Sequence, residues 1–138
     1  MGPIFRKRLP GALADVRHLN DDAARFLSVD AASPGLIHDV QLVLEEIATN
    51  VARHASPRGG IMLDVTLERD SEGVRVRVED DGAPFDPSAE PEPSIAESMG
   101  RPWPGGYGLR IVRRTAVGLT YRRAGNRNIL EMRVPERA

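Results

Sequence analysis

The chain has 138 residues, about the size of one ordinary domain, with 41% hydrophobic residues, 28% charged residues and a net charge of −1. This charge gives no electrostatic reason to expect direct nucleic-acid or membrane binding, and no apolar run approaches the roughly 20 residues of a membrane span. The absence of cysteine excludes disulfides, thiolate catalysis and zinc–thiolate sites, so we expect a cytoplasmic protein. From its length we expect a single domain over residues 1–138.

The first half of the chain alternates strand and helix patterns. Apolar and basic residues alternate over residues 4–9, which predicts a short strand. Apolar residues at helical spacing predict a first helix over residues 12–29. Ser33-Pro34 is typical of a helix start, with Ser33 as the N-cap and Pro34 in the first turn. The apolar stripe that follows predicts a second, longer helix ending near Ala55.

The second half is dominated by strand patterns. Alternating apolar residues predict strands at residues 61–68, 74–78, 119–123 and 129–134. A proline-rich segment without apolar periodicity separates the two pairs, and we expect it to form a lid over about residues 84–105. A short helix over residues 108–116 follows it. The order of elements predicts an α+β fold, a two-layer sandwich of a mixed, mostly antiparallel sheet with helices on one face.

A first group of polar residues lies on the long helix, within LVLEEIATNVARHA. Glu46, Asn50 and His54 are four residues apart, so they stack along one edge of the helix, next to the apolar stripe, with Glu45 beside them. An asparagine oxygen there could bind Mg²⁺, and a glutamate one turn away could accept a proton. Ordinary polarity of a helix surface remains the alternative for this spacing.

A second group follows the predicted strand in VRVEDDGAPFDP. Asp80 stands where that strand ends, and Gly82 lets a ligand approach the backbone closely. The carboxylate could accept a hydrogen bond from an exocyclic amine such as that of adenine. A simple Asp-Asp-Gly turn is the alternative.

A third group, PGGYGLRIVRR, places glycines 105, 106 and 108 before a helix. Backbone amides at such a helix start can hold phosphate oxygens. A flexible hinge is the alternative, because a glycine-rich turn alone is a weak signal.

In the order and separation of these three motifs, the sequence resembles the GHKL group of ATPases. EEIATNVARH looks like the N-box of that group, DDGAPFDP like its first glycine box and GGYGLRIV like its second. The resemblance is greatest to the stand-alone anti-sigma kinases of the RsbW and SpoIIAB type, and it extends from about Phe5 to Val134. It implies a Bergerat-type ATP-binding fold.

The resemblance also implies roles for single residues at the first two groups. Glu46 resembles the catalytic base of the family and Asn50 its Mg²⁺ ligand. Asp80 resembles the carboxylate that reads adenine, and Gly82 the glycine beside the base.

Further positions resemble the phosphate side of the family's site. Gly106, Gly108 and Leu109 match the glycine turn and helix start, while His54 occupies a frequent family position. Arg17 resembles an arginine near the phosphate and partner surface. Pro84 departs from the pattern, because many members have a glycine there.

The function that the resemblance implies is an anti-sigma factor serine/threonine kinase with ATP and Mg²⁺ as cofactors. It would bind a sigma factor, phosphorylate a STAS-domain antagonist and form a homodimer. Pro84 and the proline-rich segment leave open a partner-switching regulator that binds nucleotide without transferring phosphate. A structural module that binds no nucleotide is a further alternative.

Overall fold

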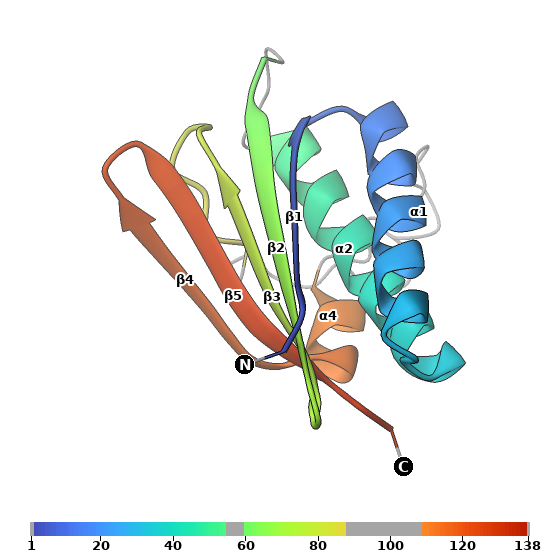
Figure 1. Ribbon diagram of the computed structural model, residues 1–138. Coiled ribbons are helices and arrows are strands. Elements are labelled where there is room, and N and C mark those ends of the chain that lie inside the picture. The colour runs from blue at the N-terminus through green and yellow to red at the C-terminus, as the bar shows by residue number, and fades with distance from the viewer. Residues whose placement is uncertain (1, 55–59, 88–108, 138) are drawn as a thin grey trace, which may run out of the picture.

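The computed structural model describes residues 2–54, 60–87 and 109–137 (Figure 1). The elements in chain order are β1 (Ile4–Pro10), α1 (Leu13–Val29), α2 (Pro34–His54), β2 (Met62–Asp70), β3 (Gly73–Asp80), α4 (Arg110–Thr115), β4 (Val117–Ala124) and β5 (Arg127–Pro135). Each element predicted from the sequence is present, with ends that differ by a few residues at most. The predicted lid falls largely outside the described residues.

The five strands form one sheet in the order β1-β2-β3-β5-β4. Every neighbouring pair in this sheet is antiparallel, so the predicted mostly antiparallel sheet is confirmed. β5 therefore lies between β3 and β4, although it follows both in the sequence. This insertion places Asp80 at the end of β3 directly opposite Asn128 of β5.

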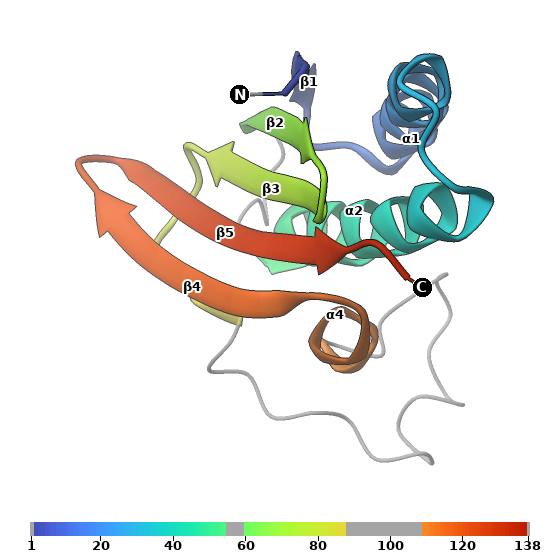
Figure 2. The same ribbon diagram turned by 60° about the horizontal axis from the view of Figure 1, so that its bottom comes forward.

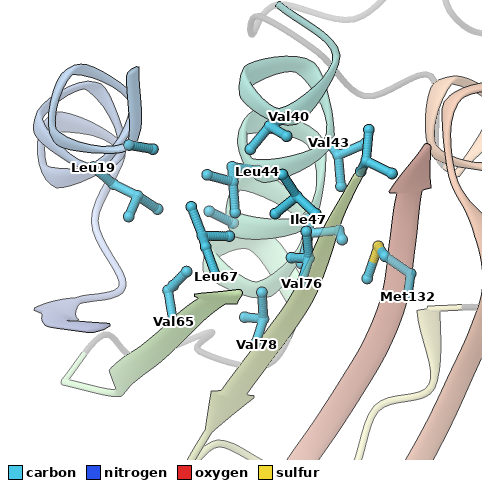
Figure 3. Packing of buried hydrophobic residues seen from close by; sticks show 14 of the residues in the cluster. Leu19, Val40, Val43, Leu44, Ile47, Val65, Leu67, Val76, Val78 and Met132 are labelled. Atoms are coloured by element: carbon cyan, nitrogen blue, oxygen red, sulfur yellow. The ribbon is translucent and has the colours of Figure 1, made fainter. Parts of the chain in front are cut away.

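All three described helices cover the same face of the sheet, which gives the predicted two-layer sandwich (Figure 2). Alternate residues of the strands point toward the helices because successive side chains of a strand face opposite sides. Val65, Val76 and Met132 thereby meet Leu44 and Ile47 of α2 in the core (Figure 3). Among the described helices, none is long and apolar enough to cross a membrane.

The first turns of α2 are fixed by two side-chain contacts. The Ser33 hydroxyl accepts a hydrogen bond from the Leu36 amide at 3.1 Å, which confirms the predicted N-cap. Asp39 is buried, and its two carboxylate oxygens accept bonds from Nε and a terminal nitrogen of Arg137 at 2.7 and 2.8 Å. A buried carboxylate requires such a partner, so Arg137 anchors the helix on which the first polar group lies.

Gly73 is a position, like Gly2, where neighbouring backbone atoms leave no room for a side chain. Its φ is +150°, and a Cβ would lie 2.1 Å from the Val134 carbonyl oxygen and 2.9 Å from the Pro135 Cα. Since both neighbours are backbone atoms, we expect Gly73→Ala to lower the free energy of unfolding by about 2–3 kcal/mol. Urea denaturation followed by circular dichroism would measure the loss. Gly35→Ala is the matched control, because nothing lies within 4 Å of its added Cβ; equal losses in both variants would contradict the prediction.

Candidate functional site

The polar edge predicted on α2 is buried in the structure. Glu46 is 5% exposed, Asn50 is 6% exposed and Thr49, between them, is also buried. Their neighbours Ile47 and Val51 belong to the hydrophobic core. Glu46 and Asn50 thus stand at the boundary of the core, as their spacing predicted, and not in open solvent. The side chain of His54 lies outside the described residues.

Asp80 ends β3 as a buried carboxylate, 4% exposed. Its Oδ1 accepts two hydrogen bonds, from the Gly82 amide at 2.9 Å and from Nδ2 of Asn128 at 2.9 Å. Within the described part of the chain, Oδ2 accepts none. One oxygen of this carboxylate is therefore used to hold the local structure, and the other is available to a ligand.

Asp80 lines a small cavity between α2 and the sheet. The other lining residues are Ile47, Val51, Val78, Phe85, Pro87, Tyr121, Asn128 and Leu130. The volume is about 10 Å³, room for about one water molecule. Apolar walls with a few fixed polar groups are typical of small-molecule sites. A flat ring could enter only if the lining side chains moved apart.

Asn128 is the centre of a hydrogen-bond network around this cavity. Its Oδ1 accepts bonds from the Tyr121 hydroxyl at 2.6 Å, an Arg123 nitrogen at 3.1 Å and the Phe85 amide at 3.4 Å. Its Nδ2 donates to Asp80 and to the Ala83 carbonyl at 2.8 Å. The network therefore joins β3, β4, β5 and the turn after Asp80.

Sequence reasoning missed Asn128, although a signal was present. Asn128 lies on the same face of β5 as Leu130, Met132 and Val134, because alternate residues of a strand share a face, and all three are buried. Asparagine is depleted in strands, so an asparagine on the apolar face of a predicted strand indicates a buried polar contact.

The turn that follows Asp80 is fixed from two sides. Asp81 Oδ1 accepts a bond from the Met62 amide at 2.9 Å, at the start of β2. An Arg123 nitrogen donates to the Gly82 carbonyl at 2.8 Å, from β4. Gly82 is buried within this turn, and its backbone is held in a defined position two residues after Asp80.

Glu79 precedes Asp80 but belongs to the opposite face of the sheet. Burial raises its pKa, yet the hydrogen bond and charge of Arg77 and the charge of Arg127 outweigh burial, so the pKa of Glu79 is lowered. Glu79 stays ionised at neutral pH in an ion-pair cluster with Arg77 and Arg127, and it does not join the cavity.

Arg17 lies at a second place on the molecule. It is exposed on α1 and lines a groove of about 460 Å³ between α1 and α2. Glu45 and Thr49 line the same groove from α2, so it runs beside the helix edge that carries Glu46 and Asn50. Arg17 is not among the residues lining the cavity of Asp80.

The structure describes only part of the predicted phosphate side. Leu109 is buried immediately before α4, where the helix start was predicted. Pro84 is exposed. Gly106 and Gly108 lie outside the described residues. Among the residues that are described, no group of three or more His, Asp or Glu side chains is arranged to hold a metal ion.

The chain belongs to the histidine kinase-like ATPase domain family, whose profile matches residues 9–134. It is also similar to the serine/threonine-protein kinase BtrW of Bordetella bronchiseptica (strain ATCC BAA-588 / NCTC 13252 / RB50). The two are 31% identical over 104 residues, which cover 75% of this chain and 73% of the relative.

Solved structures show the same fold. The RsbU and RsbW domains of Rv1364c from Mycobacterium tuberculosis match 99% of this chain with a TM-score of 0.64 and 16% identity, and the match spans 33% of that longer chain. The histidine kinase domain of the blue-light activated histidine kinase EL346 from Erythrobacter litoralis matches 93% of this chain and 62% of its own length. Its TM-score is 0.50 and its identity is 20%.

Proposed function

We propose that the chain binds Mg·ATP and acts as an anti-sigma factor serine/threonine kinase that phosphorylates a STAS-domain antagonist. The observation that carries the proposal is the state of Asp80, a buried carboxylate with one oxygen left for a ligand at an apolar cavity. Membership of the histidine kinase-like ATPase family and the likeness to a serine/threonine-protein kinase support it.

In this proposal Asp80 Oδ2 accepts the hydrogen bond of the adenine amine. Ile47 and Val51 of α2 and Leu130 of β5 provide apolar walls for the ring. Gly82 brings backbone close to the base without a side chain in the way. The cavity holds about one water molecule as it stands, so binding requires its lining side chains to move apart.

The phosphates would extend from the cavity along α2. The side-chain oxygen of Asn50 would hold Mg²⁺, which would supply neutralisation of the phosphate charge. Gly106, Gly108 and Leu109 provide backbone amides on the phosphate side, as in the family that the sequence resembles.

Glu46 would act as the base at the protein substrate. Its carboxylate takes the proton of the serine or threonine hydroxyl, the hydroxyl oxygen bonds to the γ-phosphorus, and ADP leaves. The burial of Glu46 keeps bulk water away from this proton. The resemblance assigns His54, at the end of α2, to the same site.

The partners we propose are a sigma factor, the antagonist and a second copy of this chain. Arg17, which resembles an arginine near the family's phosphate and partner surface, lines the groove between α1 and α2 with Glu45, and we take this groove as the partner surface. A transferred phosphate adds about −1.5 to −2 charges. Near Glu45 and Asp81 it is repelled, so the phosphorylated antagonist leaves.

A second candidate is a partner-switching regulator that holds nucleotide without transferring phosphate. Pro84, where many family members have glycine, and the water-sized cavity favour it. Both features bear on how ATP is enclosed, and neither removes the carboxylate that would hold adenine.

A phosphate-transfer assay with radiolabelled ATP and the cognate STAS protein distinguishes the kinase from the regulator that only binds nucleotide. We expect label on the STAS protein in a reaction that needs Mg²⁺. Nucleotide binding without label transfer would support the regulator instead. Absence of nucleotide binding would contradict both, and light scattering at micromolar concentration would test the homodimer separately.

A further inference from the structure

We propose that Asn128 is a positioning residue for nucleotide recognition, which determines the oxygen of Asp80 that is offered to the base. The inference rests on the proposed function and extends it to a residue on β5. It starts from the network in which Asn128 bonds to Asp80, Ala83, Tyr121 and Arg123.

The orientation of the Asn128 amide is set by its surroundings. Three donors converge on Oδ1, from Tyr121, Arg123 and the Phe85 backbone. Two acceptors, Asp80 Oδ1 and the Ala83 carbonyl, face Nδ2. A flipped amide would bring donors against donors and acceptors against acceptors, so only one orientation satisfies all five contacts.

This orientation divides the Asp80 carboxylate into two unlike oxygens. Oδ1 is occupied by Nδ2 of Asn128 and by the Gly82 amide, each at 2.9 Å. Oδ2 is left as the acceptor for an exocyclic amine. A carboxylate oxygen can only accept hydrogen bonds, so a base that presents an amine to it is preferred to one that presents a carbonyl.

The same amide links the carboxylate to the turn that borders the cavity. Asn128 bonds to the Ala83 carbonyl, while Arg123 bonds to both Asn128 and the Gly82 carbonyl. The acceptor and the backbone beside it are therefore fixed together from β4 and β5. A purely structural role would hold this turn without affecting the choice of base.

Asn128→Asp tests the proposal with a side chain of the same shape. The variant places a carboxylate oxygen against Asp80 Oδ1 and the Ala83 carbonyl, so acceptors face acceptors where Asn128 Nδ2 had donated two hydrogen bonds. We expect the Kd for ATP at pH 8 to rise about 10–100-fold, the effect of an unsatisfied buried contact. Asn126→Asp, an exposed change in the turn before β5, is the matched control and should bind like wild type.

The pH dependence of this variant distinguishes positioning from structure. The titratable and charged groups that face residue 128 are Asp80 from β3 and Tyr121 and Arg123 from β4. α2 faces the cavity with apolar Ile47 and Val51. At lower pH one proton shared between the two carboxyl groups lets the introduced group donate to Asp80 again. The ratio of the variant Kd to the wild-type Kd should therefore fall between pH 8 and pH 6, whereas simple loss of structure gives no such recovery.

Tyr121→Phe is the second variant, in case Asn128→Asp does not fold without ligand. It keeps the ring, Asp80 and Asn128 and removes only the hydroxyl that donates to Asn128 Oδ1 at 2.6 Å. We expect ATP to bind about 2–10-fold more weakly, the range for one hydrogen bond, with a smaller preference for ATP over GTP. The melting temperature without nucleotide should stay close to that of wild type.

Isothermal titration measures the Kd of the wild type and of each variant for ATP and for GTP. Wild-type affinity at every pH in a folded Asn128→Asp, or an unchanged affinity and base preference in Tyr121→Phe, would overturn the positioning role. Failure of the wild type to bind any nucleotide would instead overturn the proposed function, and this inference with it.

Discussion

Glu46→Gln should reduce the rate of phosphate transfer by roughly 10²–10⁴-fold while ATP binding is retained. Glutamine has nearly the same shape as glutamate, so it suits the buried position on α2 and keeps the core boundary intact. It cannot take the proton of the substrate hydroxyl, because its oxygen is part of a neutral amide. Single-turnover transfer of radiolabelled phosphate to the STAS protein would measure the loss, and isothermal titration would show that ATP still binds.

Glu45→Gln is the control for this experiment. It removes the same charge one residue earlier, where the side chain is half-buried and lines the groove between α1 and α2. We expect it to change binding of the partners more than the chemical step. Transfer by Glu46→Gln at the rate of wild type would rule out Glu46 as the base.

Asp80→Asn should abolish the rise in melting temperature that nucleotide produces. A ligand at 100 times its Kd adds about 2.7 kcal/mol, on the order of 10 °C for a domain of this size. The asparagine oxygen can still accept from Gly82 and Asn128, so the local structure is retained. Its Nδ2 then stands where Oδ2 stood, and a donor faces the donor amine of adenine.

Asp81→Asn provides the matched control for Asp80. It is the neighbouring residue, it is exposed, and its oxygen can still accept the Met62 amide. Its thermal shift should equal that of wild type in differential scanning fluorimetry with Mg·ATP. If nucleotide raised the melting temperature of Asp80→Asn as much as that of the wild type, Asp80 would not be part of the nucleotide site.

The helices and strands could be predicted from the sequence because local signals determine them. Ser33 and Pro34 mark the start of α2, and the alternation of apolar residues marks β2 and β3. The same spacing was enough to place Glu46 and Asn50 at the edge of the core, since a helix puts residues four apart on one face.

The contacts that complete the candidate site could not be predicted in this way. Asn128 meets Asp80 across 48 residues of sequence, and only because β5 is inserted next to β3. The division of the carboxylate into an occupied and an available oxygen depends on that register. The position of Arg17 in a groove away from Asp80 likewise depends on how α1 and α2 pack.

The placement of β5 has a consequence for synthesis on the ribosome. β1, α1, α2, β2 and β3 emerge first and can assemble, because their contacts lie within the first 80 residues. The outer edge of β3 then waits for β5, which begins 47 positions after Asp80, at Arg127. At about 5–20 residues per second this delay lasts on the order of 2–10 s. During that interval the nascent chain exposes an unpaired strand edge beside apolar Val74 and Val76, the kind of surface that recruits chaperones or pairs with other chains.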